Sequence, residues 1–219
     1  MAFFCVVPLF LRTRAVLGPN DASRWDTVWS LTHGKGYVID ESPYRTVDMV
    51  YNHGHYYSSK PALLPTLVAA IASLMLNTTG ATLPNQDYIL IPIIVIIINV
   101  LPFMLVIYYF GKWLDDLPYS DFTKVFCLIT AAFGTYLTAY NTSFNNHTVA
   151  AVAIMLTIII GSRIANDHAH NPLRFFLCGV LSTWVVANEL PAGFFCILTF
   201  GYLWMIERCQ TRVAPMGWA

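Results

Sequence analysis

The run ILIPIIVIIINVLPFMLVIYYF, residues 89–110, decides the fold of this chain. It contains no charged residue, and it is longer than the ~20 apolar residues that an α-helix needs to cross a bilayer. We therefore predict a transmembrane helix here. Pro92 and Pro102 predict kinks in it, because proline removes a backbone donor and disturbs the preceding turn.

Four further apolar runs follow downstream, at residues 122–140, 148–161, 173–187 and 190–206. The composition agrees, since 57% of the residues are hydrophobic and only 11% are charged, against roughly 25% charged residues in soluble domains. We predict an all-α fold, a polytopic transmembrane helical bundle with five helices over residues 89–219. The formal net charge of zero gives no reason to expect a nucleic-acid partner.

Two shorter apolar segments precede this bundle. Residues 2–11 are apolar, but Arg12 and Arg14 follow, so we interpret residues 1–18 as a partial first transmembrane helix. Residues 61–76 would reach only ~24 Å at the helical rise, less than the ~30 Å hydrocarbon core. This segment is therefore a short span, an interfacial helix or a re-entrant segment.

The one long polar region covers residues 19–60. Trp25, Val28 and Trp29 recur at helical spacing, which predicts an amphipathic helix over residues 23–33 that lies along the membrane surface. Asp21 or Ser23 is its expected N-cap. Two short strands are predicted around the turn at residues 52–54.

Charge counting and the polar groups favour different topologies. The Lys and Arg residues near the later spans alternate as one side of the membrane, which the positive-inside rule makes cytoplasmic. They are Lys112, Lys124, Arg163, Arg174, Arg208 and Arg212. If residues 61–76 span, every Lys and Arg falls on that side. If they do not, the polar region shares the external side with His147 and Glu189.

Three motifs give the chain a resemblance to a known family. Asp21 is followed three residues later by Arg24 and then by Trp25, and the stretch YYSSKPAL covers residues 56–63. Asn146-His147 begins a later span. With these motifs the chain resembles the N-terminal half of the GT-C membrane glycosyltransferases, in the branch of lipid A aminoarabinose transferases and protein O-mannosyltransferases.

The resemblance implies an external juxtamembrane helix-and-loop region over residues 19–88, so we expect residues 61–76 not to span. The chain also departs from the family pattern. Ala22 stands where many members have Glu, and Asn146-His147 stands where many have Asp. The C-terminal half of a usual member is absent, so we expect a fragment or a short relative of a longer protein.

The resemblance also implies sugar transfer from a polyprenyl-phosphate donor to an unknown acceptor, a lipid, glycan or protein, at the external face of a bacterial plasma membrane. Asp21 is the expected base for the acceptor proton. Arg24 and Lys60 are expected to balance the charge of the leaving phosphate. The remaining expected substrate-binding residues are Tyr57, Asn146, His147 and Glu189.

Each of these residues also has a plainer interpretation. Asp21 and Asn146 are of a type that caps helices, Lys60 could snorkel, and Arg24 could pair with membrane-lipid headgroups. Tyr57 would fit an aromatic belt, and Glu189 could be solvated. A divalent metal stays open at His147, although the loop histidines have no ligand spacing. The alternative function is a non-catalytic protein that binds polyprenyl phosphate, or a truncated remnant of the enzyme.

Overall fold

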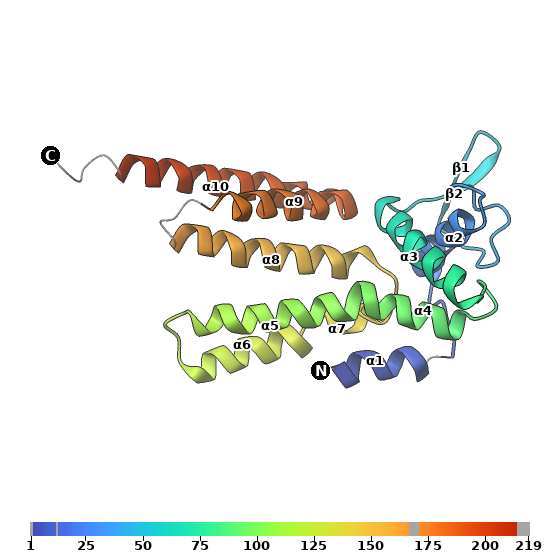
Figure 1. The fold of residues 1–219 in the computed structure, drawn as a ribbon, viewed down its shortest axis with the longest axis horizontal. Helices are drawn as coiled ribbons and strands as arrows, with labels where there is room; N and C mark the ends of the chain where they lie inside the picture. Colours follow the sequence, from blue (N-terminus) through green and yellow to red (C-terminus); the bar gives the residue numbers. More distant parts are fainter. Residues whose placement is uncertain (1, 12, 167–170, 214–219) are drawn as a thin grey trace.

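The computed structural model describes residues 2–11, 13–166 and 171–213, and it is mostly helical. The long helices lie side by side, and the polar region gathers at one end of them (Figure 1). In chain order the elements are α1 Ala2–Leu11, α2 Pro19–Thr32, β1 Met49–Asn52, β2 His55–Ser58, α3 Leu63–Thr79, α4 Asp87–Val95, the π-helical segment η1 Ile96–Val100, α5 Leu101–Asp115, α6 Asp121–Phe133, α7 Leu137–Tyr140, α8 Asn146–Asn166, α9 Pro172–Asn188, the 3₁₀ turn η2 Leu190–Ala192 and α10 Gly193–Val213.

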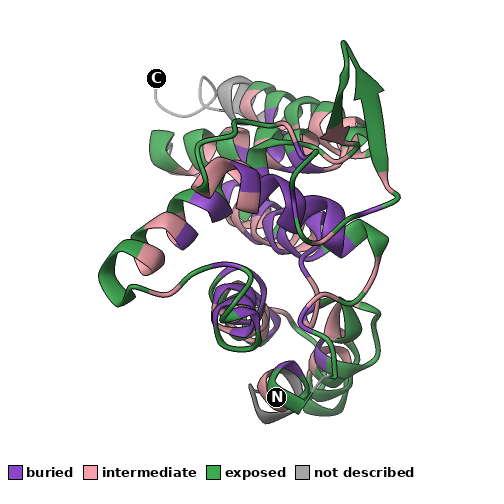
Figure 2. Ribbon diagram, turned by 90° about the vertical axis from the view of Figure 1, so that its right-hand side faces the viewer, coloured by how far each residue is buried: buried purple, intermediate pink, exposed green. Residues whose placement is uncertain are grey.

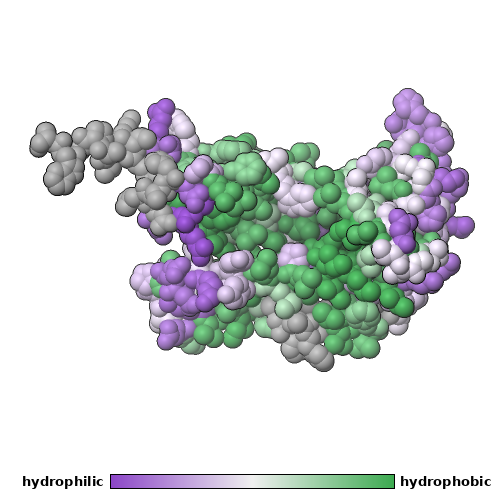
Figure 3. Space-filling model, viewed as in Figure 1, coloured by the Kyte–Doolittle hydropathy of each residue, from purple (hydrophilic) through white to green (hydrophobic). Residues whose placement is uncertain are grey.

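Three helices are long and apolar enough to cross a membrane, namely Asp87–Asp115, Asn146–Asn166 and Leu190–Arg208. Figure 3 shows a broad hydrophobic surface between two hydrophilic ends. Such a surface suits lipid tails, because hydrocarbon offers no hydrogen bonds to polar groups. The features are those of a membrane protein.

The predicted five-helix pattern holds in part. The apolar helix α9 has 17 residues and is shorter than the three long helices. The single span expected over residues 122–140 is two helices, α6 and α7, separated at residues 134–136. Gly134 stands just after α6, where its low helix propensity favours an end.

The first long span contains an irregularity that lies between the two prolines at which kinks were predicted. Pro92 lies inside α4, and the helix continues past it. The departure from α-helical geometry is the π-helical segment η1, which ends just before Pro102. Asn99 lies fully buried in this segment and donates a hydrogen bond to the Ser143 carbonyl over 2.7 Å. The π turn thus directs a polar side chain toward the loop before α8.

Helix α2, the predicted amphipathic helix, is largely covered by other parts of the chain. Residues 21–28 are all buried, and Trp25 packs against Phe144 with ring centroids 5.0 Å apart. The helix starts earlier than expected, with Gly18 as N-cap and Pro19 in the first turn, so Asp21 and Ser23 are not N-caps. Amphipathic spacing cannot distinguish a helix that faces lipid from one covered on several sides.

The predicted hairpin is present. Strands β1 and β2 pair antiparallel, with Asn52 opposite His55. His53 and Gly54 both have positive φ, 48° and 88°, as a two-residue hairpin turn of the primed type requires. The hairpin projects from the rest of the molecule and is mostly exposed (Figure 2).

Helix α3 packs against α2 and lies across the end of the long helices (Figure 1). The polar residues on both sides of it therefore remain at one end of the molecule. Arg24 from the polar region contacts Asn146 at the start of α8 directly. This is the arrangement that the convergence of polar groups favoured, and it differs from the one that charge counting favoured. We refer to this end, residues 13–80 with the loops 140–147 and 188–192, as the cap end.

Candidate functional site

Arg24 lies at the centre of the cap end. It comes from α2 and is only 5% exposed. Its Nε donates to Asn146 Oδ1 over 2.9 Å, and its NH1 donates to the carbonyls of Asn20 and Phe144 over 2.7 and 3.3 Å. One guanidinium therefore joins α2 to the loop that leads into α8, which uses the fixed fork of donors that arginine presents.

Asp21 lies one helical turn before Arg24 on the same face of α2 and is also 5% exposed. Its Oδ1 accepts a hydrogen bond from the Phe144 backbone N–H over 3.1 Å, and its Oδ2 accepts one from the Leu17 N–H over 2.8 Å. Asp21 thus connects the residue before α2, Leu17, with the loop before α8 that contains Phe144. Each carboxylate oxygen can accept a further hydrogen bond, because it has two lone pairs.

Asn145 and Asn146, at the start of α8, have different roles. Asn145 caps the helix, since its Oδ1 accepts from the Thr148 N–H over 2.9 Å. Asn146 is therefore not the cap. Besides accepting from Arg24, it donates through Nδ2 to the Asn188 carbonyl over 2.8 Å. The end of α9 is tied in this way to the start of α8.

His147 and Glu189 form a close polar contact next to this junction. His147 Nδ1 and Glu189 Oε1 are 2.8 Å apart, and their side chains are 52% and 26% exposed. The imidazole also lies against the Tyr140 ring, with centroids 5.1 Å apart. The pair connects the first turn of α8 with the residue that follows α9.

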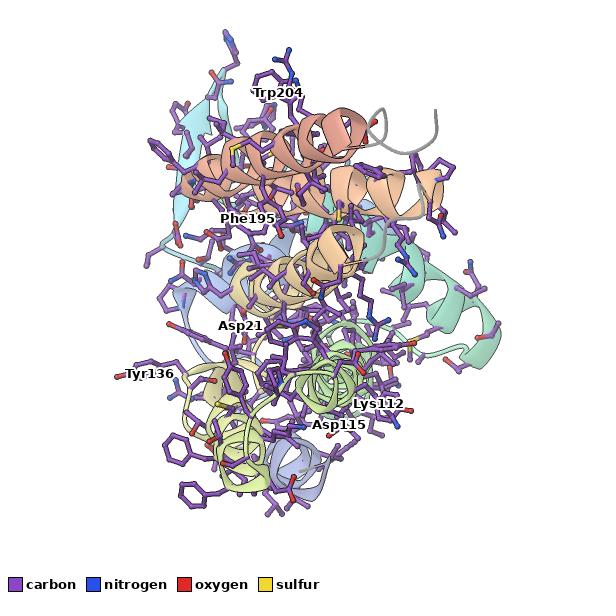
Figure 4. All side chains as sticks on the ribbon, turned by 90° about the vertical axis from the view of Figure 1, so that its left-hand side faces the viewer. Asp21, Lys112, Asp115, Tyr136, Phe195 and Trp204 are labelled. Atoms are coloured by element: carbon purple, nitrogen blue, oxygen red, sulfur yellow. The ribbon has the colours of Figure 1, made fainter. Side chains whose placement is uncertain are left out.

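A cavity of about 410 Å³ opens beside these residues. Asp21, Arg24 and His147 line it, together with residues 17–20 and residues 139–145 apart from Asn141. Figure 4 shows Asp21 among the helices, whereas Tyr136 projects from the outer edge. The structure therefore brings three of the predicted site residues to one cavity, and Asn146 and Glu189 contact two of these three.

Lys60 lies in a second polar cluster that adjoins α2. Its Nζ is 2.5 Å from Asp48 Oδ2, and Ser59 donates to the other oxygen of the same carboxylate. Burial raises the pKa of Asp48, but the hydrogen bonds from Lys60 and Ser59 outweigh it, and the pKa lies below its usual value. Asp48 is therefore ionised at neutral pH.

A chain of hydroxyl groups links this cluster to the residue before Arg24. The Lys60 N–H donates to Ser58 Oγ over 3.1 Å, and Ser58 Oγ lies 2.7 Å from Ser23 Oγ. Ser23 in turn donates to the Asp48 carbonyl over 2.6 Å. Ser23 is fully buried in α2, so the hairpin and the Lys60 loop are fixed to the helix that carries Asp21 and Arg24.

Electrostatics couple the two groups of charges. Burial lowers the pKa of Arg24, while the carboxylates of Asp21, Glu189 and Asp48 act in the opposite direction. Burial also raises the pKa of Asp26, two residues further along α2, although the Ser42 side chain and backbone N–H groups act against it. The cap end thus contains ionisable groups that are costly to desolvate, which is common at functional sites.

Tyr57 lies elsewhere. It stands in β2, opposite Val50, and bridges Val38 on its other side. The residues that line the cavity include neither Tyr57 nor Lys60. Of the loop histidines, His33 stacks on Trp29 and His55 pairs with Asp40 at 2.7 Å. Within residues 2–11, 13–166 and 171–213 no group of three or more His, Cys, Asp or Glu side chains could hold a metal ion.

The sequence interpretation missed three residues that the structure places in this region: Asp48, Asn99 and Asn188. The position of Asp48 could have been predicted. In an antiparallel hairpin, the residue before the first strand lies close to the residues after the second, which here include Lys60. Asn99 was visible as the one polar residue in the run 89–110, a position where a polar side chain needs a partner. Asn188 contributes a backbone carbonyl, and a pattern of side chains cannot predict such a contact.

Comparison of the chain with protein-family models, with curated proteins and with solved structures gives no match.

Proposed function

We propose that the protein is a membrane glycosyltransferase of the GT-C type, which moves a sugar from a polyprenyl-phosphate donor to an acceptor at the external face of a bacterial plasma membrane. One observation carries the proposal. Buried Arg24 and Asp21 line a cavity at the end of an apolar helix bundle. A polyprenyl-phosphate donor matches this arrangement, because it joins a charged phosphate to a hydrocarbon chain.

The cations are suited to the phosphate of such a donor. Arg24 presents planar N–H groups that can bind phosphate oxygens in pairs. Lys60 supplies a second positive charge from the loop that is hydrogen-bonded to Ser23. When the bond between sugar and phosphate breaks, negative charge grows on the phosphate, and fixed cations stabilise it most in the transition state.

The basic residues at the opposite end of the bundle support this orientation of the protein in the membrane. Lys112 and Arg163 lie in the last turns of α5 and α8, and Lys124 and Arg174 lie in the first turns of α6 and α9. These turns flank short connections between apolar helices, the setting in which the positive-inside rule applies. The far end then faces the cytoplasm and the cap end faces outward.

A non-catalytic protein that binds polyprenyl phosphate is the second candidate. Asp21 favours it, because both of its oxygens already accept backbone N–H groups, as a purely structural carboxylate would do. In this case the cations would hold the lipid phosphate, and the bond between sugar and phosphate would stay intact.

Reconstitution in vesicles separates the two candidates. The wild-type chain would be mixed with polyprenyl-phosphate sugars and a panel of acceptors, and release of free polyprenyl phosphate would be followed together with lipid binding. We expect release by the wild type, and a fall of about tenfold in lipid affinity for Lys60→Met, in keeping with the loss of a charged hydrogen bond.

The matched control is Lys124→Met at the far end, which we expect to bind and react as the wild type does. Binding without sugar release by the wild type would favour the second candidate. Absence of both binding and release would contradict both.

A further inference from the structure

The contact between His147 and Glu189 has an arrangement that suits proton transfer. His147 stands in the first turn of α8 and lines the same cavity as Asp21 and Arg24. Its Nδ1 is 2.8 Å from Glu189 Oε1. Glu189 is fixed at the end of α9, where its own N–H donates to the Val185 carbonyl over 2.8 Å. The carboxylate therefore holds one ring nitrogen in a defined direction.

This contact decides the roles of the two imidazole nitrogens. In a neutral imidazole one nitrogen carries the proton and the other accepts. Because Nδ1 lies against a carboxylate, the proton belongs on Nδ1, and Nε2 is the acceptor. A carboxylate placed behind an imidazole also stabilises the imidazolium that forms when Nε2 takes a proton.

Asp21 is less suited to this task. Its two oxygens accept hydrogen bonds from the backbone of Leu17 and Phe144, and both interactions weaken the attraction of the carboxylate for a further proton. The side chain of Asp21 thus fits a role in holding the cavity wall, whereas His147 is half-exposed and can exchange protons with solvent.

We infer that the pair His147 and Glu189 is the proton acceptor for sugar transfer, an assignment that rests on the proposed function. The acceptor hydroxyl oxygen attacks the anomeric carbon, and its proton passes to Nε2 of His147. The bond between the anomeric carbon and the phosphate oxygen breaks, and the phosphate leaves with the electron pair. The imidazolium then gives its proton to water, which restores the starting state.

Other groups near the imidazole bear on its protonation. Glu189 lies behind it, the Tyr140 ring from α7 lies against it, and Asp21 and Arg24 of α2 line the same cavity. The two carboxylates attract an imidazolium and the guanidinium repels it. Because Nε2 can accept a proton only while the imidazole is neutral, the rate should fall as the pH is lowered.

The test compares His147→Asn with the control His53→Asn in reconstituted vesicles, with rates measured from pH 4.5 to 8. Residue 53 lies at the exposed hairpin turn with positive φ, which asparagine tolerates. We expect His147→Asn to lower kcat by about 10²- to 10⁴-fold and to remove the acid limb, with binding of polyprenyl phosphate retained. His53→Asn should behave as the wild type.

Two further variants make the assignment specific. Glu189→Gln should lower kcat less and move the acid limb to lower pH, because it removes the charge that stabilises the imidazolium. Asp21→Asn should keep the acid limb, whatever rate remains.

Several results would overturn the assignment. An unchanged rate and acid limb in His147→Asn and in His147→Gln would do so, as would an equal loss of turnover and lipid binding. Loss of the acid limb in Asp21→Asn would assign the base to Asp21. These results leave the proposed function intact, whereas binding without any sugar release by the wild type would reject both.

Discussion

The two ends of the helix bundle contain the same kinds of charged residues in different surroundings. At the cap end, Arg24 and Asp21 are buried and hydrogen-bonded to residues more than 100 positions away in the sequence. At the far end, Lys124 donates to the nearby Asp115 carbonyl over 3.1 Å, and Lys112 lies over the ring of Tyr108. Lys112 and Asp115 are next to each other in Figure 4.

The difference shows that the desolvation cost of charged residues is concentrated at the cap end. A buried charge must be compensated by well-placed partners, whereas an exposed charge is solvated by water. The cap end therefore keeps ionisable residues at a desolvation cost, which is reasonable where a polar substrate is handled. The far end fits a simple membrane boundary. We expect the contrast to appear in stability measurements in detergent.

The largest effect is expected for Arg24→Ala. The substitution removes the donor to Asn146 and Phe144 and takes away a buried positive charge that the carboxylates of Asp21 and Glu189 stabilise. Removal of one member of a buried charged pair costs about 3–5 kcal/mol. We expect a loss of stability in this range, measured as the shift of thermal unfolding followed by tryptophan fluorescence. A shift no larger than that of an exposed residue would contradict the central role of Arg24.

A smaller effect is expected for Asn146→Ala, with Ser162→Ala as the matched change at the other end of α8. Asn146 joins Arg24 to the Asn188 carbonyl. Ser162 accepts one hydrogen bond from Trp113 over 2.7 Å. Leaving buried polar partners unsatisfied costs about 1–3 kcal/mol, whereas a neutral hydrogen bond contributes about 1 kcal/mol. Equal unfolding midpoints for the two variants would remove the proposed difference between the ends.

Local patterns in the sequence predicted much of this structure. The run 89–110 indicated the first long span, and residues 52–54 indicated the hairpin turn. Both signals depend on neighbouring residues, apolar length in one case and turn chemistry in the other. Asp21, Arg24, Lys60 and His147 were expected to act on one substrate, and the structure brings Asp21, Arg24 and His147 to one cavity but not Lys60.

The remaining contacts could not be predicted, because they depend on how distant segments pack. The sequence gives no means to decide that Asn145 caps α8 and Asn146 binds Arg24, since either asparagine suits either role. The burial of α2 on several sides has the same origin, because α3 and Phe144 cover it from elsewhere in the chain.

A pH effect is expected at Asp26, which is 1% exposed. Burial raises the pKa of its carboxyl above the usual value of 3.8. The folded chain therefore holds a proton where the unfolded chain has lost it, and Asp26 makes stability fall as pH rises above about 3.8 through the folded-state pKa. Asp26→Asn should reduce this fall, because an amide oxygen can still accept from the Thr46 N–H.

The measurement is the unfolding temperature of wild type and Asp26→Asn from pH 4 to 7. Asp48 titrates in the opposite sense, since its lowered pKa contributes stability that is lost at acid pH. For this reason the difference between the two proteins, rather than either curve alone, reports on Asp26. A difference that does not grow with pH would contradict the assignment.

The smallest effects are expected for Lys60→Met and Lys124→Met, which compare one lysine from each end. Lys60 and Asp48 have side chains 21% and 25% exposed, and a partly solvated pair of this kind contributes at most about 1 kcal/mol. Lys124 is partly exposed and contacts a carbonyl near its own helix, so its loss should change stability by less than about 0.5 kcal/mol. The two lysines should thus be nearly equal in stability measurements and differ in the binding of polyprenyl phosphate. Equal binding by the two variants would mean that Lys60 serves only to hold the hairpin, and the contrast between the ends would then be one of packing alone.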